Sequence, residues 1–186
     1  MQIYLSTLTE NDYAESLDMI EAAFRDIPHS NHDEHHLVAQ LRKAPEYRYE
    51  LEVVAKLETG DIIGHAMLSE VKIVNGESTY TALALAPVSV LPEYQQQGIG
   101  KALIQAVEER AKADDYTTVI VLGDPGYYHQ LGYQTAADYD ITAPFEIAPE
   151  YLMVKFLWDQ LEEYPHGEVV YPESFNLSMK PLEYKR

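Results

Sequence analysis

Seven residues in the middle of the chain, 95–101, have the composition of an anion-binding loop. They read Gln-Gln-Gln-Gly-Ile-Gly-Lys, and an amphipathic helix is predicted to begin at the glycines. The first N–H groups of a helix have no partner within the helix, and the helix dipole favours negative charge at the same end. The loop therefore predicts a phosphate site, and in a chain this acidic we expect an organic phosphate carried on a larger cofactor.

Two common phosphate-binding motifs do not fit these residues. A Walker A loop needs Gly-x4-Gly-Lys followed by Ser or Thr, but Lys101 is followed by Ala102. A dinucleotide-binding fingerprint needs a further glycine three residues after Gly100, and none stands there. The surroundings make the segment more specific. A strand that ends in Val-Ser-Val at 88–90 and a Pro-Glu-Tyr turn at 92–94 precede it, and a helix with a 3.6-residue apolar repeat follows.

A second segment that could do chemistry lies at 123–133. It reads Gly-Asp-Pro-Gly-Tyr-Tyr-His-Gln-Leu-Gly-Tyr, and its sixth residue is Tyr128. A tyrosine hydroxyl can donate a proton, although many buried tyrosines only pack their rings. Asp124 before Pro125 is typical of a helix N-cap and first helical residue. We expect that role for Asp124 rather than a catalytic one.

The two segments together closely resemble the GNAT superfamily of N-acetyltransferases. Residues 95–100 match its acetyl-CoA signature, Gln/Arg-x-x-Gly-x-Gly/Ala, and Tyr128 to Tyr133 match its Tyr-x-x-x-Gly-Phe/Tyr element. The chain is similar to the branch with a Gly-Asp-Pro-x-Tyr-Tyr motif, here at 123–128. The resemblance is specific from 62 to 137 and looser toward the two ends.

The resemblance implies acetyl-CoA as the co-substrate and assigns its contacts. The backbone of Val88, Ser89 and Val90 would pair with the pantetheine arm and stabilise the thioester oxyanion. Tyr128 would protonate the departing CoA thiolate as the general acid. The pyrophosphate would be bound, largely through backbone N–H groups, by Gln95, Gln96, Gln97, Gly98, Ile99, Gly100 and Lys101.

The sequence leaves the general base unknown. A thioester is already activated, so a neutral amine held beside it can attack without an enzyme nucleophile. The ammonium proton must first be removed, because the pKa of an alkyl amine is roughly 10. Some family members carry a Glu four residues before the pantetheine-binding segment, but Ala84 stands there. Three side chains remain open as the base: Glu70, Glu93 and His65.

Two other polar clusters are predicted to be solvated surface. On a helix, His32, His35 and His36 share a face, which permits metal binding, and His29 lies just before them. The cluster lacks cysteine and the ligand spacing of a known motif, so we predict no metal. The acidic segment 159–163 is predicted as a solvated face, with an amine-selective entrance as the alternative.

The composition predicts a cytoplasmic protein and limits its partners. The chain has 186 residues, no Cys, and 31 acidic against 13 basic side chains, which gives a net charge of −18. This charge repels nucleic acid backbones and anionic membranes, so neither is expected as a partner, and it attracts cations such as amines. The start lacks the basic and apolar regions of a signal peptide, and no apolar run is long enough to span a bilayer.

The helices and strands predicted around these residues indicate a single α+β domain over 1–186. A helix capped by Thr9 and a polar helix at 33–42 precede the main strands. The order strand, helix, strand around the glycine loop implies a parallel strand pair. The resemblance implies the GNAT acyltransferase fold, a mixed and mostly antiparallel sheet of about six to seven strands with flanking helices and a splayed strand pair that holds CoA. Strands are expected at 2–8, 51–57, 62–74, 80–91, 117–122, 151–158 and 168–171.

The predicted function is transfer of an acetyl group from acetyl-CoA to a primary amine by direct attack. The acceptor would be a small cationic amine or a protein amine. A non-catalytic acyl-CoA sensor or interaction module on the same fold is the alternative, and a nucleotide-binding protein is a more remote one. A homodimer is compatible with the sequence.

Overall fold

The computed structural model of the chain describes residues 1–177 and has the predicted α+β class. Within that range it contains four α-helices: α1 (Asp12–Phe24), α2 (Glu34–Leu41), α3 (Ile99–Ala113) and α4 (Pro125–His129). None of the helices in the described range has the length and apolar character needed to cross a membrane. The chain divides into two compact units, one of residues 1–69 and 86–110 and one of 70–85 and 111–186, of which 178–186 lie outside the described part.

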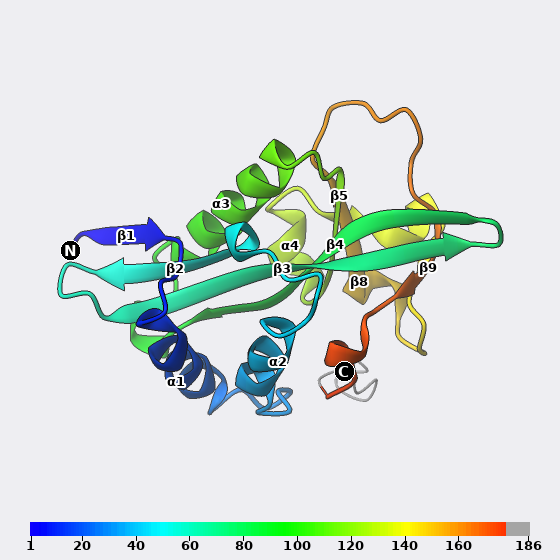
Figure 1. Cartoon of the computed structure of the whole chain (residues 1–186). Coiled ribbons are helices and arrows are strands. Elements are labelled where there is room, and N and C mark those ends of the chain that lie inside the picture. Colours follow the sequence, from blue (N-terminus) through cyan, green and yellow to red (C-terminus); the bar gives the residue numbers. More distant parts are fainter. Residues whose placement is uncertain (178–186) are drawn as a thin grey trace. The chain divides into compact units, whose positions relative to one another are not determined.

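Four strands form the sheet of the first unit, in the order β1-β2-β3-β4 (Figure 1). The β1–β2 and β2–β3 pairs are antiparallel. α1 and α2 lie on one side of these strands and α3 lies on the other (Figure 1). The strands are β1 (Ile3–Ser6), β2 (Glu52–Leu57), the first part of β3 (Ile62–Asn75) and the last part of β4 (Ser78–Val90).

The register of β2 with β3 decides which side chains face which helices. Val54 pairs with His65. Successive side chains point to opposite faces of a strand, so Glu52, Val54 and His65 share one face. Gly64 lies on the other face, where an added Cβ would come within 2.9 Å of Leu103 Cδ1 in α3. Glu52 and His65 therefore face the side of α1 and α2.

Two apolar layers hold the first unit together. Ile20 of α1 and Val38 of α2 are fully buried on one side, and Leu103 and Val107 of α3 are fully buried on the other. Burying a side chain of this size stabilises a fold by roughly 1.5–3 kcal/mol. The 3.6-residue apolar repeat predicted for α3 is confirmed by this packing.

β4 and β5 of the second unit form a parallel pair, as predicted. β5 spans Thr118–Leu122. The pairing joins two residues of each strand, Leu83–Val119 and Ala84–Ile120, and extends no further within the described residues. Both strands continue beyond the last pair, β4 as far as Val90.

The remaining strands of the second unit are short. β8 (Leu152–Phe156) pairs antiparallel with β5, β6 (Gln134–Thr135) with β8, and β9 (Gly167–Val170) with the outer part of β3, while β7 (Ile141–Thr142) runs parallel to β9. The described residues thus contain nine strands, more than the six to seven predicted. β6 and β7 account for the difference, because a two-residue strand carries no detectable alternation of apolar and polar residues.

The N-termini of two helices test the predicted caps, and the prediction at Thr9 was wrong. α1 begins after Asn11, and the Thr9 hydroxyl donates to Asp12 Oδ2 at 3.1 Å instead of capping a backbone N–H. At α4 the Asp124 side chain accepts from the Gly126 N–H at 3.1 Å. Asp124 is therefore an N-cap, as predicted.

Candidate functional site

The predicted anion-binding loop lies in the first unit and leads directly into α3. A 3-10 turn, Pro92–Tyr94, precedes it. Gln96 and Gly98 have φ angles of 61° and 81°, in the left-handed region. The first turn of α3 is closed by a hydrogen bond from the Ala102 N–H to the Gly98 carbonyl at 3.1 Å. The N–H groups of residues 99–101 therefore have no carbonyl to bond within the helix.

Two glutamine side chains fix the loop to the residues before it. Gln95 Nε2 donates to the Val90 carbonyl at 2.9 Å, and Gln97 Nε2 reaches the Glu93 carbonyl at 3.5 Å. Residues 95–98 are exposed. The loop thus leads on a fixed frame into the unpaired N–H groups at the start of α3, an arrangement that suits binding of a pyrophosphate.

The end of β4 before the loop lies close to β3 and α3. A Cβ on Gly64 would lie 3.3 Å from the Ser89 carbonyl oxygen and 2.9 Å from Leu103 Cδ1, so this approach needs glycine. Val88 and Val90 are half-buried, whereas Ser89 is buried. The Ser89 hydroxyl has no hydrogen-bond partner among residues 1–177.

Tyr128 belongs to the second unit, where its ring is held by its neighbours. A Cβ on Gly123, the residue after β5, would come within 2.5 Å of Tyr128 Cε2, so the ring lies directly on that glycine. The rings of Tyr127 and Tyr133 meet it edge-on, with centroids 5.0 Å and 5.6 Å away. The Tyr133 N–H also donates to the Tyr128 carbonyl at 3.1 Å. The spacing of the motif therefore corresponds to direct contacts around one ring.

The structure distinguishes the three candidates for the general base. Glu70, in the second unit, accepts a hydrogen bond from the Tyr116 hydroxyl. Glu93 is exposed in the turn before the loop. His65 is fully buried in the first unit, and its Nε2 lies 2.6 Å from Glu52 Oε2. Of the three, His65 alone belongs to a buried network.

Glu52 is the centre of that network, and the sequence-based prediction missed it. Arg42 Nη2 donates to Oε2 at 2.7 Å, and Arg42 Nε lies 3.1 Å from each carboxylate oxygen. The Tyr47 hydroxyl donates to Oε1 at 2.6 Å, and His65 bonds Oε2. A signal was present in the buried run Leu-Glu-Val-Val at 51–54, because a buried carboxylate must be paired.

The network determines the ionisation of two of its members. Burial alone would raise the pKa of Glu52, but the hydrogen bonds and charges of His65 and Arg42 lower it to about 2. Burial and the adjacent Glu52 carboxylate raise the pKa of Tyr47 well above its usual range. Glu52 is therefore an anion and Tyr47 a neutral donor near neutral pH.

We expect the fold to lose stability in acid through Glu52. Its folded pKa of about 2 lies below the ordinary value of 4.5, so the ionised carboxylate stabilises the fold above pH 4.5. That contribution is lost as the pH falls from 4.5 toward 2. The shift corresponds to about 3 kcal/mol at neutral pH. Urea unfolding near neutral pH and near pH 3 measures it.

The Glu52→Gln variant isolates this group from the other carboxylates. Glutamine does not titrate, so the difference in free energy of unfolding between wild type and variant should narrow by about 2 kcal/mol between neutral pH and pH 3. Glu46→Gln, at an exposed position, is the matched control and should show no narrowing. A difference that stays constant between the two pH values would contradict the depressed pKa of Glu52.

The histidine cluster makes contacts within the chain. His32 Nδ1 lies 3.0 Å from the Phe24 carbonyl, and the rings of His35 and His36 have centroids 4.0 Å apart. Across residues 1–177, no group of three or more His, Cys, Asp or Glu side chains could hold a metal ion. His32 connects the end of α1 with the segment before α2.

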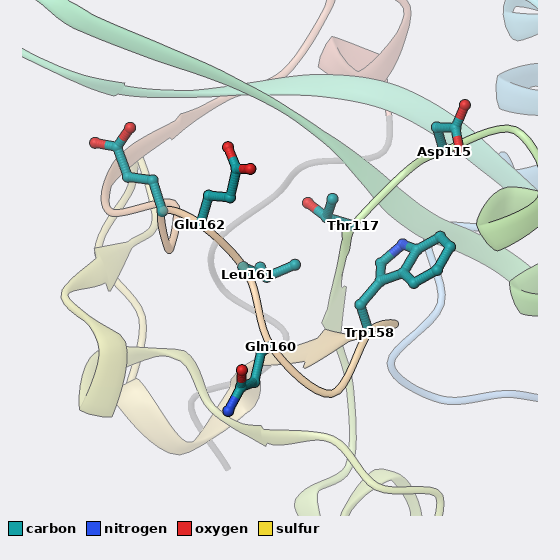
Figure 2. Close-up of a pocket in the computed structure, with 7 residues that line it drawn as sticks. Asp115, Thr117, Trp158, Gln160, Leu161 and Glu162 are labelled. Atoms are coloured by element: carbon teal, nitrogen blue, oxygen red, sulfur yellow. The ribbon is translucent and has the colours of Figure 1, made fainter.

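The acidic segment 159–163 borders a cavity in the second unit. The cavity has a volume of about 440 Å³, and its wall combines the exposed ring of Trp158 with carboxylates (Figure 2). Lys112 Nζ lies 4.8 Å from the Trp158 ring centroid. The space is a shallow pocket that is open to solvent rather than enclosed. The lining residues are Asp115, Thr117, Trp158, Gln160, Leu161, Glu162 and Glu163.

Comparison with known proteins identifies the family. Residues 5–136, well over half of the chain, match the family model described as an acetyltransferase (GNAT) domain. The chain is also 30% identical over 152 residues to the uncharacterized N-acetyltransferase YjhQ of Escherichia coli (strain K12). The aligned residues make up 81% of this chain and 82% of that protein. The chain therefore belongs to the GNAT acetyltransferase superfamily, as its two motifs indicated.

Two solved structures extend the likeness over most of the chain. A GNAT family acetyltransferase from Brucella melitensis in complex with acetyl-CoA has a TM-score of 0.76 and 29% identity, over 94% of this chain and 99% of its own. YhbS from Escherichia coli in complex with CoA has a TM-score of 0.81 and 25% identity, over 95% of this chain and 93% of its own. The GNAT fold is thereby confirmed, and the Gly-Asp-Pro-x-Tyr-Tyr branch stays a prediction.

Proposed function

We propose that this chain is an acetyl-CoA-dependent N-acetyltransferase that acts as one domain over residues 1–186. The observation that carries the proposal is the loop at the start of α3, whose N–H groups offer a site for the pyrophosphate of acetyl-CoA. The family and its CoA-bound members support the same acetyl donor. In this proposal the pyrophosphate is bound by Gln95, Gln96, Gln97, Gly98, Ile99, Gly100 and Lys101.

The end of β4 and the hydroxyl of Tyr128 would serve the chemical step. The backbone of Val88, Ser89 and Val90 would bind the pantetheine arm and stabilise the oxyanion. The amine attacks the thioester carbonyl directly, so a C–N bond forms and the C–S bond breaks, and proximity supplies much of the rate. Tyr128 would give its proton to the departing thiolate.

In our proposal the acceptor is a primary amine, with a small cationic amine favoured over a protein amine. The net charge of −18 attracts a cation at long range. Glu162 and Glu163 line the same pocket as Trp158 and would offer one surface for an ammonium group, because carboxylates attract cations. We also propose a cytoplasmic location, in keeping with the acidic, cysteine-free composition.

We expect the purified protein to bind acetyl-CoA and to release free CoA when it is offered a suitable amine. Calorimetry measures the binding. A thiol reagent follows the release across a panel of diamines, monoamines and peptides with a free N-terminus or lysine. Binding without turnover for any amine would contradict catalysis and favour a non-catalytic acyl-CoA sensor. Thermal protection by ATP but not by CoA would contradict the binding site itself.

A further inference from the structure

Two buried polar atoms on neighbouring strands of the first unit are left without partners. His65 Nδ1 and Ser89 Oγ have no hydrogen bond to any described residue, although His65 is fully buried and Ser89 is 5% exposed. A buried polar group without a hydrogen-bond partner destabilises the fold. Such groups call for an explanation, and a catalytic role is one of the few that repeatedly applies.

The two residues lie across from each other on β3 and β4. The Leu91 N–H donates to the Ile63 carbonyl at 2.9 Å. In an antiparallel ladder, two steps along each strand from that pair bring Ser89 opposite His65, on the same face. The 3.3 Å approach of a Gly64 Cβ to the Ser89 carbonyl oxygen agrees with this register. Opposite residues have Cβ atoms about 4.5–5.5 Å apart, so the two side chains lie within reach of each other, although no hydrogen bond joins them in this structure.

Glu52 determines which nitrogen of His65 can accept a proton. A carboxylate only accepts hydrogen bonds, so Nε2, at 2.6 Å from Glu52 Oε2, carries the hydrogen. In a neutral imidazole the other nitrogen is then an acceptor. In the neutral ring Nδ1 therefore has an open lone pair, and no described residue bonds this nitrogen.

Charged and titratable groups from several elements belong to the network around Glu52 and His65. β2 supplies Glu52, and the end of α2 supplies Arg42. α1 supplies Tyr13, whose ring centroid lies 4.8 Å from the Arg42 guanidinium carbon, and the segment after α2 supplies Tyr47. The ionised carboxylate stabilises an imidazolium once it forms.

We propose that Glu52, His65 and Ser89 form a relay that removes the proton of the acceptor amine. The inference rests on the proposed function, because it requires the acetyl group to lie at Val88–Val90. Ser89 Oγ takes a proton from the ammonium as the Ser89 hydroxyl gives its own proton to His65 Nδ1. Ser89 is the group that touches the amine, and His65 and Glu52 are positioning residues that act through it.

The protons balance over the whole reaction. The ammonium loses one proton to the relay before it attacks, and the nitrogen loses a second proton after the C–N bond has formed. The second proton balances the one that Tyr128 gives to the thiolate. The first returns from His65 Nδ1 through the Ser89 hydroxyl to solvent after the product has left, so the relay returns to its starting state and one proton is released per acetyl transfer.

The His65→Gln variant tests the relay with little change to the fold. Its amide can still donate to Glu52, but it cannot take up a proton at the place of Nδ1. We expect kcat near neutral pH to fall about 100-fold. Near the pKa of the amine, about 10, the loss should shrink to less than tenfold, because solvent then removes the proton. Ser89→Ala should show the same dependence on pH.

Matched controls and two further measurements separate the relay from damage to the fold. His36→Gln and Ser78→Ala, at exposed positions, should keep the wild-type kcat throughout. The affinity of His65→Gln for CoA should equal that of wild type, and ¹⁵N NMR of wild-type His65 should show hydrogen on Nε2 and none on Nδ1. Wild-type turnover itself tests the proposed function. An equal loss of kcat at both pH values, no loss at all, or hydrogen on Nδ1 would overturn the relay.

Discussion

Gly98→Glu is expected to weaken the binding of acetyl-CoA about a thousandfold. Gly98 has a φ of 81° and open space where a Cβ would lie, so the variant strains the backbone and puts a carboxylate at the start of α3. A like charge beside the pyrophosphate costs several kcal/mol, and every 1.4 kcal/mol is about a tenfold change in affinity. Calorimetric titration with acetyl-CoA measures the change.

The Gly60→Glu control distinguishes loss of the acetyl-CoA site from loss of stability. Gly60 also has a left-handed φ, 92°, with no atom within 4 Å of an added Cβ, but it lies in the turn between β2 and β3. Both variants carry similar backbone strain and the same new charge, so their Tm values should fall by similar amounts. Acetyl-CoA affinity should stay at the wild-type level in Gly60→Glu. Wild-type affinity in Gly98→Glu would remove the loop from the binding site.

The loop was predictable from sequence because its chemistry is local. The left-handed glycine, the free N–H groups and the apolar repeat of α3 all belong to one continuous stretch of chain. The Asp124 cap of α4 is local in the same sense, since its partner is the N–H of Gly126. Neither feature depends on how distant strands pair. The geometry of such a motif can therefore be predicted from its own residues.

The Glu52 network was not predictable, because it joins residues that are distant along the chain. Glu52 and His65 share a face only after β2 and β3 pair in the observed register, and Arg42 reaches them from the end of α2. His65 was one of three candidates for the base, but the sequence alone does not indicate that Glu52 would be its partner. The incorrect prediction of a cap at Thr9 has a similar cause. Asp12 accepts from the Thr9 hydroxyl, and its position also depends on a bond at 2.8 Å to Lys56 in β2, which is distant along the chain.

Tyr128→Phe is expected to lower kcat by about 10²- to 10⁴-fold while the affinity for acetyl-CoA stays near that of wild type. The variant loses only the hydroxyl, and the ring keeps its contacts with Gly123, Tyr127 and Tyr133. Without that hydroxyl the thiolate leaves as an anion or takes its proton from water, and both are slower. Thiol release at saturating acetyl-CoA and amine measures kcat, and calorimetry measures the affinity.

Tyr127→Phe is the matched control, because it removes the same atom one residue earlier in α4. Its kcat should stay near that of wild type. Gly123→Ala keeps the Tyr128 hydroxyl but displaces the ring, since its Cβ would lie 2.5 Å from Cε2, so it should lower kcat as well. Unchanged turnover in Tyr128→Phe would remove this residue from the mechanism. We expect kcat to fall in both Tyr128→Phe and Gly123→Ala and to stay at the wild-type value in Tyr127→Phe. That pattern would indicate that the proton donor is the Tyr128 hydroxyl, held in place by the residue after β5.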